Sequence, residues 1–280
     1  MEYLEARRAR VEDRLASVVA GVDPAELRDR VDHAALSGGK RVRPTVTILA
    51  CEALGGEPAD AVDFAVGIEL VHTASLVIDD IIDESEVRRG AQSAWAAYGH
   101  GPAVIASDGL IGEAFRLFSA SPRAMERVAS AMVDLGEGEA TELVAEPTDE
   151  AAYMELARQK TGALFRAAAE LGAIAADAPI ATVDGLGQYA ERVGIAFQMR
   201  DDVLDAVADP SELGKPTGQD VTMERPSLVR VAELTPEEAD AKARTQADLA
   251  LEALDGVAIR DGTARDYLAD LAEFVVTREH

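Results

Sequence analysis

Apolar residues recur every three or four positions along most of the chain, which is the spacing of one face of an α-helix. Glycine and proline separate the periodic segments, as at Gly55-Gly56, Pro147 and Pro179. No segment alternates apolar and polar residues for long enough to predict a sheet. We therefore expect an all-α fold in one domain, residues 1–280. The expected helices cover residues 2–20, 43–55, 58–84, 104–118, 122–145, 149–176, 181–208, 236–254 and 263–278.

The longest break in this helical pattern lies at residues 209–226 (DPSELGKPTGQDVTMERP). The segment is polar, contains glycine and proline, and directly follows a cluster of aspartates. Long loops in compact domains are commonly functional. We expect this loop to act as a lid.

Two aspartate clusters with the spacing DDxxD lie near the ends of predicted helices. Residues four apart share a helix face, so each cluster projects its carboxylates together. Like charges this close disfavour one another's ionisation, and a hard cation such as Mg²⁺ relieves the repulsion while also binding phosphate oxygens. Because so acidic a chain contains DDxxD by chance roughly 0.2 times, the flanking residues must decide its meaning. The clusters are Asp79, Asp80 and Asp83, and Asp201, Asp202 and Asp205.

Basic segments flank both clusters. The segment GGKRVRP, residues 38–44, places three cations next to the start of a predicted helix, and its glycines allow close approach of the backbone to phosphate. Arg88-Arg89 follows the first cluster; alone, it would be interpreted as a solvated surface pair. Three of the four lysines fall in candidate phosphate sites, which favours a phosphate-binding role for the whole set. These lysines are Lys40, Lys160 (followed by Thr161) and Lys215.

One histidine shares a helix face with the first aspartate cluster. His72 and Ser75 lie on the stripe that continues through Asp79 and Asp83, and Gln198 shares the face of the second cluster. A lone histidine on a helix usually has no chemical role, but this position favours substrate binding. His33, His100 and Cys51 have no partners at metal-ligand spacing and receive no role.

Composition and charge narrow the class of protein. Hydrophobic residues make up 48% of the chain, which excludes disorder, and the formal charge of −25 argues against nucleic-acid binding. The excess of carboxylates indicates a protein adapted to high salt; the alternative is an acidic protein from an alanine-rich proteome. The single cysteine, the charged N-terminal segment and the lack of an uninterrupted apolar run predict a cytoplasmic protein without a transmembrane segment.

Taken in order, these motifs resemble those of the trans-isoprenyl diphosphate synthases. The resemblance rests on GGKRVRP, ELVHTASLVIDDIIDESEVRRG, KTGALF, FQMRDDVLD and GKPTGQD, and it extends over about two-thirds of the chain. It implies a bundle of long helices around a deep central cavity, usually as a homodimer. It also implies an enzyme that condenses isopentenyl diphosphate with an allylic diphosphate.

The resemblance assigns roles to individual residues. Three Mg²⁺ ions on the allylic diphosphate are held by Asp79, Asp80, Asp83, Asp201 and Asp205. The diphosphate oxygens are held by Arg88, Lys160 and Lys215, within a site that includes Thr161, Gln198 and Asp202. Isopentenyl diphosphate is bound by Gly39, Lys40, Arg43, His72 and Arg89.

Three other functions compete with this interpretation. A class I terpene cyclase shares the first cluster but normally carries a different second motif. A regulatory, non-catalytic paralogue usually loses one cluster, and both are intact here. An acidic cation buffer would explain the carboxylates but not the ordered lysines and arginines.

Product length is predicted from the residues just before the first cluster. In the family that the sequence resembles, bulky residues there close the floor of the cavity, whereas here Ala74 and Ser75 are small. We therefore expect an all-trans product of twenty carbons (geranylgeranyl) or longer. The alternative is that Ala74 and Ser75 merely permit close helix packing.

Overall fold

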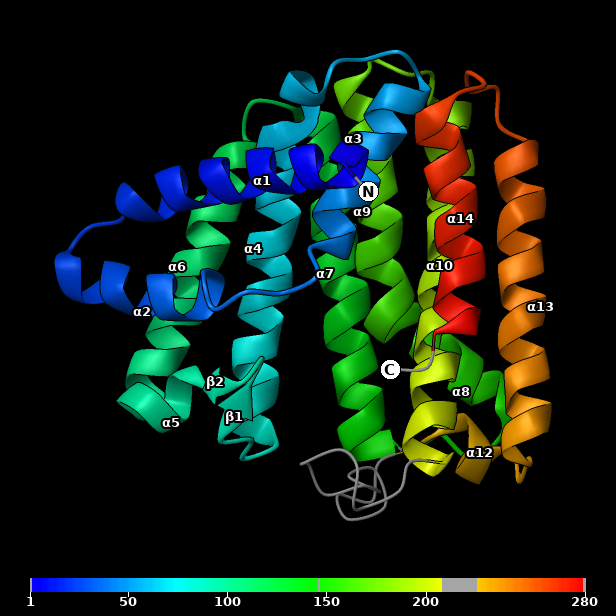
Figure 1. Ribbon diagram of the computed structural model, residues 1–280. Helices are drawn as coiled ribbons and strands as arrows, with labels where there is room; N and C mark the ends of the chain where they lie inside the picture. Colours follow the sequence, from blue (N-terminus) through cyan, green and yellow to red (C-terminus); the bar gives the residue numbers. More distant parts are fainter. Residues whose placement is uncertain (1, 146, 208–225, 279–280) are drawn as a thin grey trace.

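The computed structural model describes residues 2–145, 147–207 and 226–278, which form a bundle of helices (Figure 1). The α-helices are α1 Glu2–Ala20, α2 Ala25–Ala35, α3 Val42–Ala53, α4 Pro58–Ile82, α5 Ala94–Tyr98, α6 His100–Phe118, α7 Pro122–Ala140, α8 Glu150–Ala157, α9 Ala163–Ala175, α10 Ile180–Val207, α12 Leu228–Val231, α13 Pro236–Asp255 and α14 Thr263–Thr277. Two π-helical turns, η1 Thr141–Ala145 and η2 Arg158–Gly162, interrupt this pattern. The all-α prediction is confirmed.

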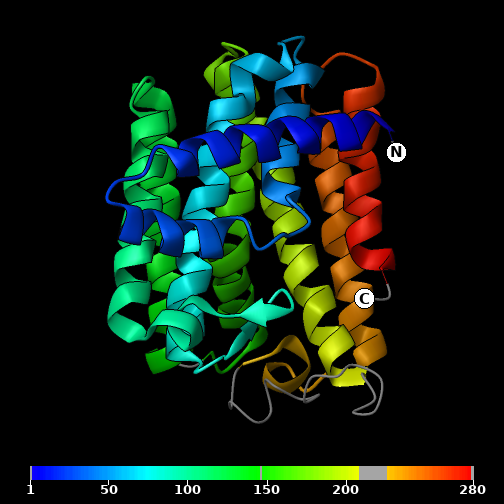
Figure 2. The same cartoon turned by 60° about the vertical axis from the view of Figure 1, so that its left-hand side comes forward.

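The long helices run roughly along one axis, and α1 and α2 cross them on one side (Figures 1 and 2). The most extensive helix contacts join α10 to α13, α4 to α6 and α9 to α10. Each of these helices turns an apolar face inward, and much of the core between them is alanine, valine and leucine. Because these side chains are small, the helix axes can approach closely and pack around one core.

Local sequence signals set where several helices begin. Thr235 caps α13 through a capping box: its hydroxyl accepts from Glu238 N at 3.2 Å, and Glu238 Oε2 accepts from Thr235 N at 2.8 Å. Ser121 caps α7 directly before Pro122. The predicted bounds of most helices agree with the structure within a few residues. The predicted helix over 149–176 is instead divided into α8, η2 and α9.

A short hairpin corrects the expectation that the chain has no strands. Strand β1 (Val87–Arg88) pairs antiparallel with β2 (Ala91–Gln92), and Arg89 and Gly90 form the turn with φ of +54° and +80°. Two consecutive residues with positive φ are typical of the type I′ turn that suits a tight hairpin. Strands of two residues are too short to produce a period-two pattern, so the sequence could not reveal them.

Helix α4 passes through the core. By length and composition it could cross a membrane, and no other helix among the described residues qualifies. However, most of its apolar stretch is buried inside the protein. The helix packs against α3, α6 and α9, so its apolar character is explained by the core.

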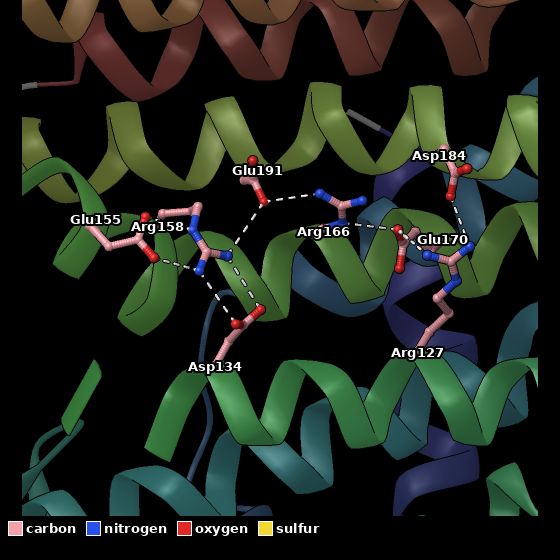
Figure 3. Close-up of polar contacts among 8 residues, drawn as sticks. All are labelled: Arg127, Asp134, Glu155, Arg158, Arg166, Glu170, Asp184 and Glu191. Atoms are coloured by element: carbon pink, nitrogen blue, oxygen red, sulfur yellow. Dashed lines mark hydrogen bonds and ion pairs between the residues drawn. The ribbon is translucent and has the colours of Figure 1, made fainter. Parts of the chain in front are cut away.

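A chain of ion pairs joins α7, α8, η2, α9 and α10 (Figure 3). At its centre is Glu170, which is 2% exposed; its Oε1 accepts from Arg166 Nε at 3.0 Å and from Arg127 Nη1 at 3.3 Å. Burial raises the pKa of Glu170, while the two guanidinium groups oppose that shift. We call this set the ion-pair network; it comprises Arg127, Asp134, Glu155, Arg158, Arg166, Glu170, Asp184 and Glu191.

Candidate active site

The two aspartate clusters lie at the same end of the bundle, because α4 and α10 both have their C-terminal ends there (Figure 1). Asp79 and Asp80 occupy the last turn of α4, and Asp83 caps it. Asp201, Asp202 and Asp205 occupy the last two turns of α10. The negative ends of the two helix dipoles add negative potential, which further favours cations at this end of the molecule.

In the first cluster, Asp80 is committed to an internal partner. Its side chain is buried, and its Oδ1 accepts from Arg88 Nε at 2.9 Å. The hairpin thus places Arg88 beside α4. Asp79 and Asp83 are only partly buried, and the charge of Asp79 raises the pKa of both Lys160 and Glu139.

In the second cluster, Asp202 organises the surrounding helices. Its Oδ2 accepts from the Tyr153 hydroxyl at 2.6 Å and from Leu228 N at 2.7 Å, and its Oδ1 accepts from Gln198 Nε2 at 3.0 Å. Gln198 Oε1 in turn accepts from the Thr161 hydroxyl at 2.7 Å. One buried carboxylate therefore fixes α8, α10, η2 and the start of α12 relative to one another.

Asp201, also in the second cluster, pairs with a residue near the C-terminal end of the chain. Arg278 directly follows α14, and its guanidinium pairs with Asp201 and lies 3.8 Å from the centre of the Phe197 ring. Arg200 holds the Arg278 carbonyl through two hydrogen bonds of 3.1 and 2.8 Å. Burial raises the pKa of Asp201, and the charges of Arg278 and Lys40 oppose that shift.

The glycine-rich segment before α3 meets the hairpin. Gly38 and Gly39 have φ of +91° and +131°, and a Cβ at Gly39 would lie 2.9 Å from Arg89 Cζ. Glycine is therefore needed there both for its backbone conformation and for the close approach of Arg89, whose Nη1 donates to Gly38 O at 2.6 Å. Lys40 is exposed.

One of the three cations predicted in this segment is structural. Arg41 is 2% exposed and donates to Glu12 at 2.8 Å and to Glu69 at 2.7 Å. The hypothesis that all three cations serve phosphate is wrong for Arg41, because its guanidinium is consumed by two internal carboxylates. Lys40 and Arg43 are the two that are not buried in such pairs.

Arg43 and His72 form a pair between α3 and α4. Arg43 Nη1 lies 3.0 Å from His72 Nε2, and since arginine only donates, Nε2 accepts and the proton sits on Nδ1. Burial, followed by the charges of Arg43 and Arg89, lowers the pKa of His72 well below its ordinary value. Burial also lowers the pKa of Arg43 to about 10, which still leaves it charged at neutral pH. The pair is thus a neutral imidazole beside a cation.

Lys160 projects from η2 toward the first cluster. Its ammonium pairs with Glu142, and with Glu139 at 3.4 Å. Burial lowers its pKa, but the charges of Glu142, Glu139 and Asp79 outweigh burial, so the net shift is upward. Lys160 is therefore a permanent cation. Lys215 and the expected lid lie outside the described residues, apart from Pro226.

The residues predicted to set product length lie on different sides of α4. Ala74 is buried, and its carbonyl accepts from the Ser107 hydroxyl of α6 at 3.1 Å. Ser75 is half-buried and donates to His72 O at 2.9 Å. Their role in product length stays a prediction.

Sequence reasoning missed several residues of this region. Glu69 was visible as an acid within an apolar helix, and Glu139 and Glu142 as acids three positions apart. Tyr153 and Arg278 gave no local signal, because their importance comes from partners 49 and 77 positions away.

The sequence and the fold were compared with those of known proteins, and both have similar counterparts. Residues 24–254 match the family described as Polyprenyl synthetase. The chain is 31% identical to a short chain isoprenyl diphosphate synthase of Methanothermobacter thermautotrophicus, with 100% of this chain and 99% of that protein covered. It is 30% identical to a geranylgeranyl pyrophosphate synthase of Geoglobus acetivorans, with 100% and 99% covered. Among solved structures, it is similar to a geranylgeranyl pyrophosphate synthetase of Pyrococcus horikoshii (TM-score 0.90, 32% identity, 99% and 98% covered).

Proposed function

This chain belongs to the polyprenyl synthetase family and is an isoprenyl diphosphate synthase, a trans-prenyltransferase. We propose that it extends an allylic diphosphate with isopentenyl diphosphate to an all-trans product of twenty carbons or more. In this proposal the aspartate clusters and their flanking cations hold the allylic diphosphate. The GGKRVRP segment, His72 and Arg89 hold isopentenyl diphosphate.

The observation that carries the proposal is the connection of both aspartate clusters through η2. Lys160 lies within electrostatic reach of Asp79, and Thr161, the next residue, is linked through Gln198 to Asp202. The turn that carries this cation is therefore connected to both clusters, through Lys160 to the first and through Thr161 to the second. Such an arrangement suits a diphosphate that is bridged to carboxylates by metal and neutralised by a fixed ammonium.

The donor set fits Mg²⁺. Among the described residues, no three His, Cys, Asp or Glu side chains are close enough to hold a metal by themselves. Mg²⁺ typically takes one or two carboxylates and completes its shell with water and phosphate oxygens, so each cluster needs to supply only part of a shell. We propose that Asp79, Asp83, Asp201 and Asp205 supply these oxygens, with Asp80 joining once Arg88 turns to the diphosphate. When bound, the metal neutralises charge that develops on the departing diphosphate.

The residues of the chain then bind, orient and shield the substrates. Arg88 and Lys160 hold oxygens of the leaving diphosphate, so that its carbon–oxygen bond ionises to an allylic cation. Arg43 and Arg89 hold the diphosphate of isopentenyl diphosphate, whose double bond attacks that cation before a proton is lost. Neutral His72 accepts from Arg43 and so fixes the direction of that guanidinium. Apolar helix walls exclude water from the cation.

The proposed product of twenty carbons or more is supported by the small residues Ala74 and Ser75. It is also supported by the names of the relatives, which include geranylgeranyl synthases. Replacing Ala74 by Phe tests the position. If Ala74 faces the growing chain, the variant should release a shorter product. If it only packs against α6, the variant should keep the wild-type product and lose about 1–3 kcal/mol of stability through overpacking.

We further propose that the enzyme acts as a homodimer in a reducing, cytoplasmic setting. Val104 and Ile105 on α6 are 42% and 56% exposed, which supports a contact with a second copy. The lone, buried Cys51 supports a reducing compartment. Light scattering during size-exclusion chromatography tests the dimer, and a monomeric wild type at micromolar concentration would refute it.

The decisive experiment is a product assay. Purified protein is given labelled isopentenyl diphosphate, each allylic primer in turn, and Mg²⁺, and the products are separated by chain length. We expect products of twenty carbons or more that disappear with chelator. A wild-type product of only fifteen carbons would refute the length, and no product with any primer would favour the regulatory paralogue.

A further inference from the structure

Two π-helical turns face each other beside the candidate site. Turn η1 carries Glu142 after α7, turn η2 carries Lys160 before α9, and these two side chains form an ion pair. Isolated π-helical turns in α-helices occur frequently at functional sites, because the inserted residue redirects the side chains of that turn. Here both partners of a single pair are presented by such turns.

The backbone of η2 is held tightly on both sides. A Cβ at Gly138 of α7 would lie 3.0 Å from Lys160 N, and a Cβ at Gly194 of α10 would lie 2.9 Å from Gly162 Cα. Contacts this short leave no room for larger residues. The main chain that carries Lys160 is therefore fixed, but the four-carbon side chain beyond it needs its own restraint.

Two carboxylates supply this restraint. Lys160 is 18% exposed, and Glu142 and Glu139, which face it, are 8% and 20% exposed. An ammonium has three donors and a flexible stem whose ordering costs conformational entropy, so carboxylates that fix it in advance remove that cost from substrate binding. Burial raises the pKa of Glu139 to about 7, as expected where a second acid joins a pair that already has one.

We propose that Glu142, assisted by Glu139, is a positioning residue that holds the Lys160 ammonium toward the first aspartate cluster in readiness for the allylic diphosphate. The inference rests on the proposed function, in which Lys160 contacts that diphosphate. It adds a specific claim: the two acids act through Lys160 and not on the substrate itself.

A competing role makes the opposite prediction. If Glu142 acted only through its own charge, it would repel an anionic substrate, and Glu142→Gln would tighten diphosphate binding. If it positions Lys160, Glu142→Gln should weaken binding of inorganic pyrophosphate with Mg²⁺ about tenfold. The same variant should raise KM for the allylic substrate, lower kcat and leave KM for isopentenyl diphosphate unchanged.

A double-mutant cycle tests whether the effect passes through Lys160. Pyrophosphate affinity, measured by calorimetry in the presence of Mg²⁺, is compared among wild type, Glu142→Gln, Lys160→Ala and the double variant. We expect Glu142→Gln to change affinity less than twofold once Lys160 is alanine. A full effect in the Lys160→Ala background, tighter binding, or wild-type affinity in Glu142→Gln would each overturn the proposal.

The chain contains a matched control. Glu150 pairs with Lys242 at 2.6 Å, and both side chains are more than a third exposed. Glu150→Gln should leave turnover and pyrophosphate affinity unchanged. If Glu142→Gln does not fold, as judged by its thermal melt, Glu139→Gln is tested in the same cycle and should show the same sign. An inactive wild type would refute the proposed function, whereas an active wild type matched by folded Glu142→Gln would refute this inference alone.

Discussion

Arg158 and Lys160 are both in turn η2, yet they serve two charged regions with different properties. Arg158 joins the ion-pair network, where Asp134 lies at 3.3 Å and Glu155 at 2.7 Å (Figure 3). Lys160 pairs with Glu142 and Glu139 and lies within electrostatic reach of Asp79 in the first aspartate cluster. The hydrogen bond with Glu155 is the main cause that raises the pKa of Arg158. The guanidinium of Arg158 is therefore paired with carboxylates of the protein itself.

The two regions differ in which parts of the chain provide the oppositely charged partners. In the ion-pair network, each arginine bridges acids from neighbouring helices with its planar fork, which favours rigidity. At the candidate site, cations and carboxylates from distant segments meet at the ends of helices. The same residue types thus stabilise the fold in one region and, in our proposal, leave charge available for a substrate in the other.

The largest expected effect separates the two regions by activity. Asp79→Ala and Asp201→Ala should each lower turnover on the order of a thousandfold or more, since each removes a proposed metal ligand. Asp134→Ala, in the ion-pair network, should retain most of its turnover. Steady-state assays with Mg²⁺, with thermal melts as a folding check, measure this contrast. Near-wild-type turnover of either site variant would contradict the proposed metal role.

The second effect separates the regions by stability. Arg166→Met should lower the free energy of unfolding by about 3 kcal/mol, because Glu170 then stays buried with only Arg127 at 3.3 Å. Denaturant titration measures the change, and Arg244→Met, which removes an exposed pair with Asp240, serves as control. A loss no larger than that of the control would show that the network contributes little to stability.

The third effect concerns pH dependence at the candidate site. Glu139 has a pKa of about 7 in the folded protein against an ordinary value of 4.5, so between these values the folded state binds the additional proton. Its contribution to stability is complete below pH 4.5 and is lost as pH rises through 7. Glu139→Gln should remove this slope and be more stable than wild type above pH 7, on the order of 2 kcal/mol. Parallel slopes of unfolding free energy from pH 5 to 8 would contradict the shift.

The smallest effect concerns salt. Because the net charge is −25, screening should reduce surface repulsion, and the melting temperature should rise by several degrees between low salt and molar KCl. The buried pairs around Glu170 should be less screened, so Arg166→Met should show a similar rise. A flat or falling melting temperature would refute adaptation to high salt while leaving the enzymatic proposal intact.

Much of the fold could be predicted because its signals are local. The three-to-four spacing of apolar residues and the punctuation by glycine and proline located the long helices within a few residues. The two-residue strands could not be found, since a period needs several residues to be recognised. Likewise, the π-helical turns left no mark on the apolar pattern of residues 149–176.

The candidate site divides in the same way. Spacing within one helix predicted that Asp79 and Asp83 share a face and that Gln198 shares the face of Asp201, because side chains three or four apart lie on one side of a helix. The structure adds the hydrogen bond from Gln198 to Asp202. Which charges remain available was decided by partners far away in the chain. Arg41 is consumed by Glu12 and Glu69, although its sequence position is equivalent to that of its basic neighbours.

By itself, the sequence determined the helical class, the two aspartate clusters and the family resemblance, since each depends on residue types and short spacings. Only the tertiary structure decided that Lys160 faces Glu139 and Glu142 and that Arg278 returns to Asp201. Those pairs join segments 18 to 77 residues apart. The physical reason is that charge interactions depend on distance in space and on burial, and helix packing sets both.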